Sequence, residues 1–285
     1  MQFQTIKITA ASEGKRLDAY LTKKLKLSRN QIQHLIQDSN IHLNTKTPKK
    51  SGIKLKKGDQ IAYRLPEPKS AHEPEEIPLE IIHEDKDLLV INKPAGIVVH
   101  PDNSGHDSGT IVNAALAHCK NPKLIHRLDK DTSGVLLIAK NTASHEKYQK
   151  LFQGRKVEKT YIALVKGHPK TKEGRIEASI KRGTKQRKQM AISKQGKEAI
   201  TTFRVLETHE KTSLLEVKIE TGRTHQIRLH LASIGHPVVG DEKYGCKRIN
   251  KTFARLGLTR QFLHAKKIKI AGKTFTAPLP SDLTI

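Results

Sequence analysis

The run His126-Arg127-Leu128-Asp129-Lys130-Asp131-Thr132-Ser133-Gly134 places an arginine two residues ahead of a carboxylate in a polar segment. The apolar residues 135–139 follow at once and predict a buried strand. Polar groups presented at the end of a rigid strand are how many active sites are built. By itself the run is also consistent with a solvated charged turn, so the choice depends on the rest of the chain.

Further segments match the motifs of one enzyme family. The run resembles the H-R-L-D-x-x-T-S-G motif of the RluA-type pseudouridine synthases, which carries their catalytic aspartate. The other matching segments, in chain order, are I-N-K-P-A-G-I-V-V-H-P at 91–101, E-K-T-Y-I-A-L-V at 158–165, T-G-R-T-H-Q-I-R-L-H at 221–230 and F-L-H-A at 262–265. The resemblance covers residues 80–280, and ordered motifs are far more specific than one loop.

The resemblance implies an α+β fold with a mainly antiparallel central sheet of the pseudouridine synthase type, surrounding a basic cleft. The chain looks most like the RluD branch, which modifies large-subunit ribosomal RNA. Its segment 119–125 is shorter than the glycine-rich stretch usual there, which leaves open which uridines are modified.

Composition points to a polyanionic partner. The chain has 285 residues, long enough for two domains, and a formal net charge of +25. It contains no apolar run of membrane-spanning length, and its first residues lack the apolar core of a signal peptide. We therefore expect RNA rather than a membrane as the partner. Ribosomal RNA is favoured, free or in a pre-ribosomal particle, and a transfer RNA target remains the alternative.

Cysteine and motif content indicate a cytoplasmic enzyme without a cofactor. The two cysteines, Cys119 and Cys246, form no C-x-x-C pair, which suits a reducing compartment. The sequence contains no common zinc, P-loop or dinucleotide motif. We expect a cytoplasmic monomer with no metal and no cofactor, and an isomerisation needs neither.

Residues 1–65 predict a small α/β domain. Residues 1–64 carry 14 Lys and Arg against 4 Asp and Glu. Leu17, Tyr20, Leu21 and Leu25 have helical spacing, and Ser28 with Gln31 predicts a capping box for a second helix whose buried face is Ile32, Leu35 and Ile36. Residues 41–43 and 61–63 predict strands. The domain resembles the alpha-L RNA-binding domain of a small-subunit ribosomal protein through R-L-D at 16–18, S-R at 28–29, L-I at 35–36 and K-G-D at 57–59. The alternative is a charged domain with no RNA role.

Residues 66–87 separate this domain from the catalytic region. They hold Pro66, Pro68, Pro74 and Pro78, and eight acids against two lysines, so we interpret them as an extended acidic linker. The catalytic domain is then expected over residues 88–285. Within it, alternating apolar residues predict a strand ending at Ile219, and a helix is expected at 142–153.

The resemblance makes Asp129 the catalytic carboxylate. Forming pseudouridine breaks the bond from ribose to nitrogen, turns the base and makes a carbon–carbon bond. The family's aspartate either attacks the sugar or removes a sugar proton, and the residues do not choose between these routes. Both need an ionised carboxylate, which a neighbouring arginine would favour. Asp131, two residues on, matches a variable position and is expected only to stiffen the loop with Thr132 and Ser133.

The resemblance suggests Arg223, in the G-R-x-H-Q motif, as the partner of Asp129 through a bidentate ion pair. The alternative is that Arg223 is a surface residue at a strand end. Arg228 is expected to contact phosphate or to serve the structure. Tyr161 matches the family's active-site tyrosine, whose ring can stack on uracil. Leu263 matches an apolar residue of the base pocket, although a core role is nearly as good.

Arg127 and His126 precede the aspartate. A uridine in paired RNA must leave the helix, and the resemblance supports Arg127 as the side chain that fills the gap. His126 is expected to brace the loop beside the substrate. Residues 181–188 hold five cations and predict a loop that grips phosphates, or else a solvated tip. Two functions stay open: an active RNA pseudouridine synthase, or an RNA-binding ribosome-assembly factor with a degenerate catalytic domain. The presence of Asp129, Tyr161 and Arg223 favours the enzyme.

Overall fold

The computed structural model describes residues 3–65, 73–100, 108–183 and 189–284, and the chain divides into two units between residues 71 and 72. The expected domain at the N-terminus is therefore a separate compact body. The second unit contains all the motifs that carry the family resemblance.

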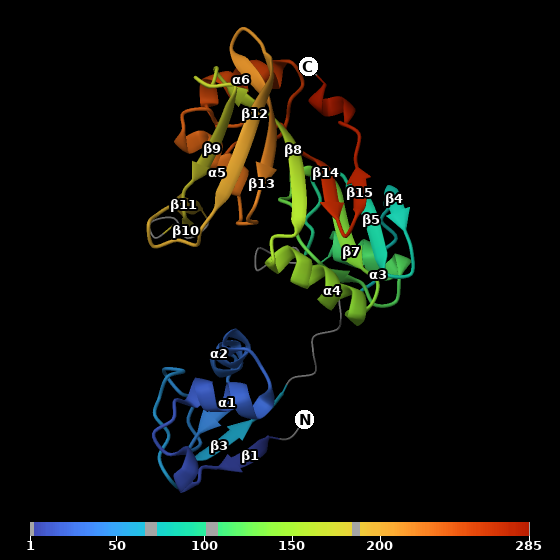
Figure 1. The fold of residues 1–285 in the computed structure, drawn as a ribbon. Helices are drawn as coiled ribbons and strands as arrows, with labels where there is room; N and C mark the ends of the chain where they lie inside the picture. The colour runs from blue at the N-terminus through green and yellow to red at the C-terminus, as the bar shows by residue number, and fades with distance from the viewer. Residues whose placement is uncertain (1–2, 66–72, 101–107, 184–188, 285) are drawn as a thin grey trace. The chain divides into compact units, whose positions relative to one another are not determined.

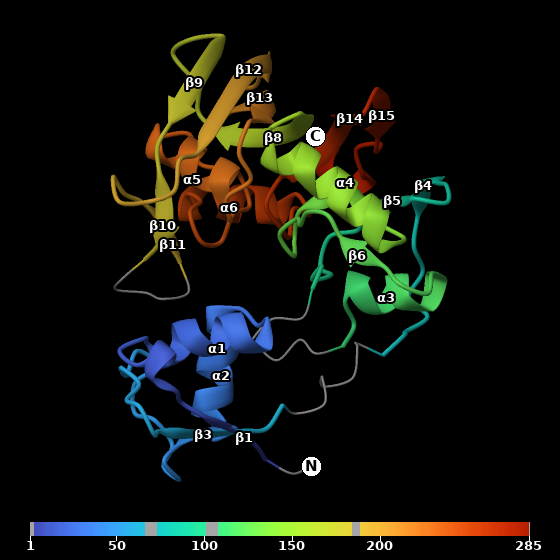
Figure 2. The same cartoon turned by 60° about the horizontal axis from the view of Figure 1, so that its bottom comes forward.

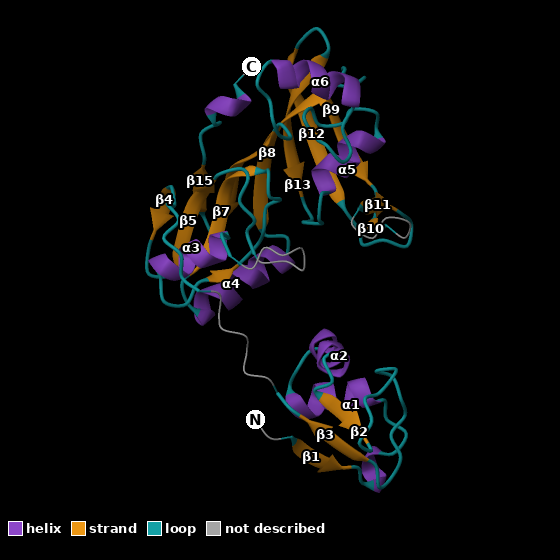
Figure 3. Cartoon of the chain, turned by 180° about the vertical axis from the view of Figure 1, so that it is seen from behind, coloured by secondary structure: helices purple, strands orange, loops and turns teal. Residues whose placement is uncertain are grey.

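The N-terminal unit packs two helices on one face of a three-stranded antiparallel sheet (Figure 3). The capping box is present at Ser28, where the side chain and backbone of Gln31 complete both bonds. The predicted face of this helix is buried, and it packs with Leu17 and Leu21 of the preceding helix. The elements are β1 (Gln4–Lys7), a 3-10 turn (Ala10–Ser12), α1 (Leu17–Leu25), α2 (Arg29–Gln37), β2 (Ile41–Leu43) and β3 (Gln60–Tyr63).

The second unit is built on one ten-stranded sheet (Figure 1). All its strand pairs are antiparallel except β7 with β14, so the sheet is mixed but mainly antiparallel. In order across the sheet, the strands are β4 (Ile81–Glu84), β5 (Leu88–Lys93), β7 (Ser133–Ala139), β14 (Leu263–Ile270), β8 (Val157–Lys166), β13 (Thr212–Ile219), β12 (Ile200–Thr208) and β9 (Glu173–Glu177), with β15 (Lys273–Thr276) beside β14 and β6 (Lys123–Leu124) beside β7.

Helices lie against both halves of this sheet (Figure 2). The predicted helix at 142–153 is present, with Asn141 as its N-cap. A separate hairpin projects beyond the sheet in the part of the chain that the structure describes. The helices are α3 (Ile111–His118), α4 (Thr142–Gln153), α5 (Gln226–Ser233), α6 (Lys247–Arg255) and a 3-10 turn (Ser281–Leu283), and the hairpin is β10 (Ile180–Arg182) with β11 (Met190–Ile192).

The interpretation of residues 66–87 as a linker is wrong for their second part. Residues 66–72 lie outside the described residues, but Ile81–Glu84 form edge strand β4, paired with β5. The preceding residues are also fixed, because the Glu75 carboxylate accepts the Gly109 N–H at 3.0 Å and the Glu73 carbonyl accepts from Asn113 at 2.9 Å. An edge strand pairs on one side only, so it tolerates the charges and nearby prolines that suggested a linker.

Gly134 allows the parallel pair to form directly after the loop that holds Asp129. Its φ is +112°, and a Cβ there would lie 2.3 Å from the carbonyl oxygen of Ala265, its partner on β14. No L-residue with a side chain fits this approach without moving the backbone. The glycine that ends the opening motif therefore joins the loop of Asp129 to the strand of Leu263.

None of the helices in the described ranges has both the length and the apolar character needed to cross a membrane.

Candidate active site

The segment 129–133 is a tight turn at the start of β7. The Thr132 N–H donates to the Asp129 carbonyl at 3.1 Å, which closes the turn. Apolar side chains of β7 anchor it, since residues 133–139 are all buried. The turn therefore presents the Asp129 side chain from a rigid strand, as the opening motif predicted.

A buried lysine supports the turn from one side. Lys93, at the end of β5, has no exposed surface, and its ammonium donates to the carbonyls of Lys130 at 2.9 Å and Pro94 at 2.6 Å. The Gly96 N–H also donates to the Lys130 carbonyl, at 3.0 Å. Burial lowers the pKa of Lys93 to about 7, although the charges of Asp131 and Asp129 oppose this effect.

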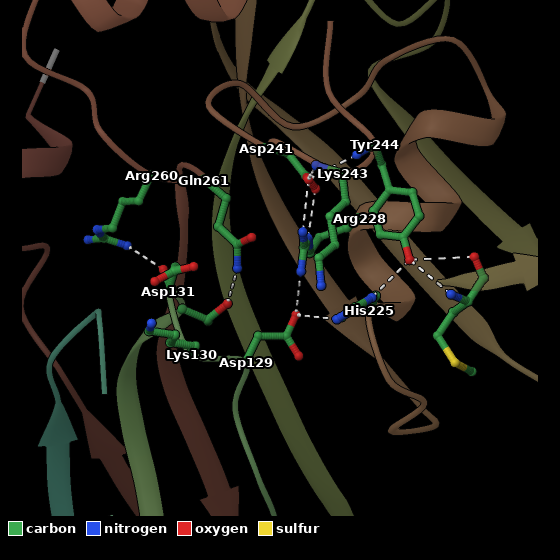
Figure 4. A network of polar contacts seen from close by, with 12 residues as sticks. Asp129, Lys130, Asp131, His225, Arg228, Asp241, Lys243, Tyr244, Arg260 and Gln261 are labelled. Atoms are coloured by element: carbon green, nitrogen blue, oxygen red, sulfur yellow. Dashed lines mark hydrogen bonds and ion pairs between the residues drawn. The ribbon is translucent and has the colours of Figure 1, made fainter. Parts of the chain in front are cut away.

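Arg260 and Gln261, which precede β14, hold the turn from another side (Figure 4). Arg260 donates to the Asp131 carbonyl at 3.0 Å and to the Ser133 hydroxyl at 3.2 Å. Its guanidinium also binds the Asp282 carboxylate, at 2.6 and 3.0 Å. The Gln261 amide donates to the Thr132 hydroxyl at 2.7 Å. The stiffening expected of the loop is thus provided by Thr132 and Ser133, while Asp131 contributes its backbone carbonyl.

Asp129 opens into a pocket of about 540 Å³. That volume is within the range of small-molecule sites. The pocket brings together the loop before β7 and segments from β8, β13, β14, α4 and α5. Every site residue predicted from the sequence lines it: His126, Arg127, Asp129, Tyr161, Arg223, Arg228 and Leu263.

The partner of Asp129 is Arg228, not Arg223. Arg228 is 5% exposed, and its Nη1 donates to Asp129 Oδ2 at 3.0 Å. Its other edge forms a bidentate pair with Asp241, through Nε at 2.7 Å and Nη2 at 2.8 Å (Figure 4). The assignment of the ion pair to Arg223 is therefore wrong, and the structural role expected of Arg228 is only part of what it does.

The charges of this triad stabilise one another. Burial opposes the charge on Arg228, but hydrogen bonds to Asp241 and the charges of Asp241 and Asp129 raise its pKa above the ordinary value. Burial likewise opposes the charge on Asp241, yet Arg228 and two backbone N–H groups lower its pKa overall. A permanently charged guanidinium held by one buried aspartate is thus presented to Asp129.

The turn before α5 explains why Arg223 points elsewhere. Buried Gln226 accepts the Arg223 N–H at 3.0 Å and the Thr221 hydroxyl at 2.7 Å, which folds residues 221–226 tightly. The Arg223 side chain then donates through Nε to the Glu198 carbonyl at 3.0 Å. Arg223 stays on the pocket wall, while the helix turn beginning at Gln226 brings Arg228 to Asp129.

His225 is a second neighbour of the carboxylate that the sequence reasoning did not single out. Its Nε2 lies 3.9 Å from Asp129 Oδ2, and its Nδ1 lies 2.9 Å from the Tyr244 hydroxyl. Its backbone is left-handed, with φ +54°, which is uncommon for a residue other than glycine. The ring of Tyr244 also packs against Arg228, with its centroid 5.3 Å from the guanidinium carbon.

Tyr161 and Leu263 form the less polar side of the pocket. They lie on neighbouring strands, β8 and β14, and are 8% and 4% exposed. Burial and the negative charge of Asp129 raise the pKa of Tyr161, so its phenol stays protonated. A flat ring beside an aliphatic chain suits a nucleobase.

Arg127 and His126 differ in their surroundings. Arg127 is exposed and has no hydrogen-bond or ion-pair partner in the described chain, so its guanidinium is available at the pocket mouth. The His126 ring stacks on Phe152 with centroids 5.0 Å apart, and its Nε2 accepts the Leu137 N–H at 3.1 Å. Burial, with the charge of Lys159, lowers the pKa of His126 to about 3. The bracing role expected of it fits these contacts.

Other functional residues were missed by sequence reasoning. Asp241 and Tyr244 follow a buried Val-Val-Gly step at 238–240, and a carboxylate just after such a step was the available signal. Asp131, the second acid of the D-x-D pair, is not part of the pocket lining. In the cation-rich segment 181–188, residues 184–188 lie outside the described residues.

Comparison with known proteins agrees with this geometry. Residues 87–233 match the RNA pseudouridylate synthase family, and residues 15–61 match the S4 domain. An uncharacterised RNA pseudouridine synthase of Aquifex aeolicus is 44% identical, with 86% of this chain and 81% of that protein covered. Ribosomal large subunit pseudouridine synthase D of Zymomonas mobilis is 37% identical, with 100% and 96% covered. The solved structure of human RNA pseudouridylate synthase domain containing 1 has a TM-score of 0.60 and 29% identity, covering 75% of this chain and 86% of that one.

The matched region contains Asp129, Tyr161 and Arg228, and the relatives align over nearly the whole chain. The chain belongs to the RNA pseudouridylate synthase family, the enzymes that convert uridine to pseudouridine in RNA.

Proposed function

We propose that this enzyme isomerises uridines of large-subunit ribosomal RNA, with Asp129 as its catalytic carboxylate. The observation that carries the proposal is the ion pair of Asp129 with Arg228, at 3.0 Å, on the wall of a nucleoside-sized pocket. Two relatives named as ribosomal large subunit pseudouridine synthase D, from Zymomonas mobilis and Escherichia coli, support the choice of RNA.

In the proposed reaction, the ribose C1′–N1 bond breaks with its electron pair left on N1, the uracil turns, C1′ bonds to C5, the hydrogen on C5 leaves as a proton, and N1 takes up a proton. An ionised Asp129 can add to C1′ or take the C2′ proton, and both routes use the same carboxylate position. Arg228 donates to one oxygen of that carboxylate at 3.0 Å, which leaves the other oxygen to face the sugar.

The pocket requires the uridine to leave its stack. Tyr161 offers a ring for the flipped uracil, and Leu263 fills the apolar side. Exposed Arg127 is placed to occupy the space that the base leaves, because it lies at the pocket mouth two residues before Asp129. The flipping of the uridine out of the helix is then coupled to its binding beside the Asp129 carboxylate.

The remaining charge serves RNA binding. The formal net charge is +25, and the S4 unit adds a basic surface of its own. We further propose a cytoplasmic monomer acting on free ribosomal RNA or on a pre-ribosomal particle. Its two cysteines, Cys119 and Cys246, are unpaired, as is usual in a reducing compartment.

Tritium release tests this function directly. RNA carrying tritium on C5 of uracil is mixed with the wild type and with Asp129→Ala, because that hydrogen is lost only when C5 becomes the attachment point. Release by the wild type alone is expected, with equal RNA affinity for both proteins, since phosphate contacts supply most of the binding. Release by Asp129→Ala at the wild-type rate would exclude the assigned carboxylate. RNA binding without release, from ribosomal RNA, transfer RNA and pre-ribosomal particles alike, would support an assembly factor instead.

A further inference from the structure

We propose that Lys159, flanked by Arg155 and Arg223, forms a binding site for one backbone phosphate next to the target uridine. The proposal rests on the proposed function, and it assigns a role to cations of the pocket that the chemistry at Asp129 does not use. The chemical class of the ligand is a phosphodiester of RNA.

Lys159 is a buried cation without an anion. It is 7% exposed, yet it has no hydrogen-bond or ion-pair acceptor in the described chain. Its ammonium lies 5.7 Å from the centroid of the Phe152 ring, and the side chain lines the pocket. Burial lowers its pKa to about 8, and the positive charges of Arg155 and Arg223 contribute. A buried lysine is normally paired, so an unpaired one facing a pocket is a candidate site for an anionic ligand.

The surrounding charges also favour an anion. Five of the pocket's lining residues are cations and only two are acids. The cations are Arg127, Arg155, Lys159, Arg223 and Arg228, and the acids are Asp129 and Glu220. Arg228 is already engaged by two carboxylates, and Arg155 is held by Glu198. Lys159 is therefore the buried cation whose charge is left for the substrate.

The position of Lys159 on its strand fits a nucleotide. Lys159 and Tyr161 are two residues apart on β8, so their side chains leave the same face of the sheet, about 7 Å apart along the strand. Tyr161 is the proposed stacking partner of the uracil, and Asp129 acts at the sugar. One nucleotide carries its base and its phosphates on opposite sides of the ribose, so a uridine placed on Tyr161 can direct a phosphate to Lys159.

Neutral linkages in the RNA test the contact. A synthetic RNA that the wild type converts is prepared with a single methylphosphonate on either the 5′ or the 3′ side of the target uridine. In the wild type, one of the two neutral linkages is expected to lower kcat/KM for tritium release about 10- to 100-fold, the usual effect of losing a charged hydrogen bond. On unmodified RNA, Lys159→Met is expected to lower kcat/KM by the same factor. Neutralising that linkage should cause no further decrease in this variant.

Two further variants test whether the effect depends on the Lys159 contact itself or on any positive charge of β8. Lys159→Arg should keep most of the rate and the sensitivity to the neutral linkage. Lys166→Met removes a lysine from the far end of the same strand, outside the pocket lining, and should leave both unchanged. Equal sensitivity of Lys159→Met and the wild type to both neutral linkages would overturn the subsite while leaving the proposed function intact. Absence of release by the wild type would instead refute the function, and affinities for the same RNAs would still test the subsite.

Discussion

The hydroxyl of Tyr244 lies 2.9 Å from Nδ1 of His225, whose Nε2 faces Asp129 at 3.9 Å. The same hydroxyl contacts the Met190 backbone, accepting from its N–H at 3.2 Å and lying 3.4 Å from its carbonyl oxygen, so that carbonyl and His225 are alternative acceptors of the hydroxyl hydrogen. When Tyr244 donates to Nδ1, the hydrogen of a neutral His225 is on Nε2, which faces the carboxylate. Tyr244 and His225 thus connect Met190 of β11, in the projecting hairpin, with Asp129 (Figure 4).

Tyr244→Phe removes only this hydroxyl, since the ring that packs on Arg228 remains. We expect kcat to fall about 2- to 10-fold, the effect of losing one hydrogen bond that orients His225, with KM unchanged. Tritium release under saturating and limiting RNA separates the two constants. An unaltered kcat would show that the hydroxyl has no part in positioning the carboxylate.

Arg228 should contribute strongly to the stability of the folded protein. Arg228→Gln leaves the fully buried Asp241 carboxylate without its partner, so the free energy of unfolding should fall by about 3–5 kcal/mol. Urea denaturation measures this change. Arg223→Gln serves as the comparison, because among the described residues the Arg223 side chain binds only a backbone carbonyl. Arg223→Gln should leave the free energy of unfolding nearly unchanged while weakening RNA affinity. A large loss of stability in Arg223→Gln but not in Arg228→Gln would make Arg223 the partner of Asp129.

Gly134→Ala should be strongly destabilising. A Cβ at this position would lie 2.3 Å from the Ala265 oxygen, and the φ of +112° is unfavourable for alanine. We expect a loss of about 3 kcal/mol or more in unfolding free energy. Gly222→Ala is a matched control, because nothing lies within 4 Å of a Cβ there and its φ lies outside the left-handed region that disfavours alanine. Similar midpoints for the two variants in urea would contradict the close strand approach.

Activity and stability should move in opposite directions above neutral pH. The pKa of Lys159 in the folded protein is about 8, below its ordinary 10.5. Raising the pH through about 8 therefore removes the charge that binds phosphate, and kcat/KM should fall. Between about 8 and 10.5 the unfolded chain binds more protons than the folded one, so this residue makes the folded state more stable as pH rises. Lys93, with a pKa of about 7, acts in the same sense from a lower pH.

Lys159→Arg tests which residue causes the fall in activity. Arginine stays charged over this pH range, so the alkaline decrease in kcat/KM should disappear in that variant. Rates measured from pH 6.5 to 9.5 at constant ionic strength give the two profiles. A decrease of the same size in both proteins would assign it to another group.

Much of this fold could be predicted from local patterns. The capping box at Ser28, the helix at 142–153 and the strand ending at Ile219 depend on spacing and on nearby side chains, and all three are present. The acidic stretch before β5 was misassigned because edge pairing and the bond of Glu75 to Gly109 are contacts between distant segments. Composition alone does not contain such contacts.

The site likewise combines features that local motifs predict with contacts between distant segments that they do not. The motifs predicted seven site residues that all line one pocket, but they did not decide which arginine contacts Asp129. That choice depends on the turn closed by Gln226, whose amide donates to the Ile200 carbonyl on another strand. Asp241 was missed for a related reason, because its importance is visible only once Arg228 is seen between two carboxylates.

The contacts of Arg260 have a consequence for the order in which the site can form. Asp129 leaves the ribosome long before Arg260 and Asp282, and both of those residues lie beyond position 233, where the family match ends. A nascent chain that has already produced its aspartate, tyrosine and paired arginine still lacks the residues that fix the Asp131 carbonyl and the Ser133 hydroxyl. These contacts can therefore form only after this later part of the chain has been made and has returned to hold a loop that was made first.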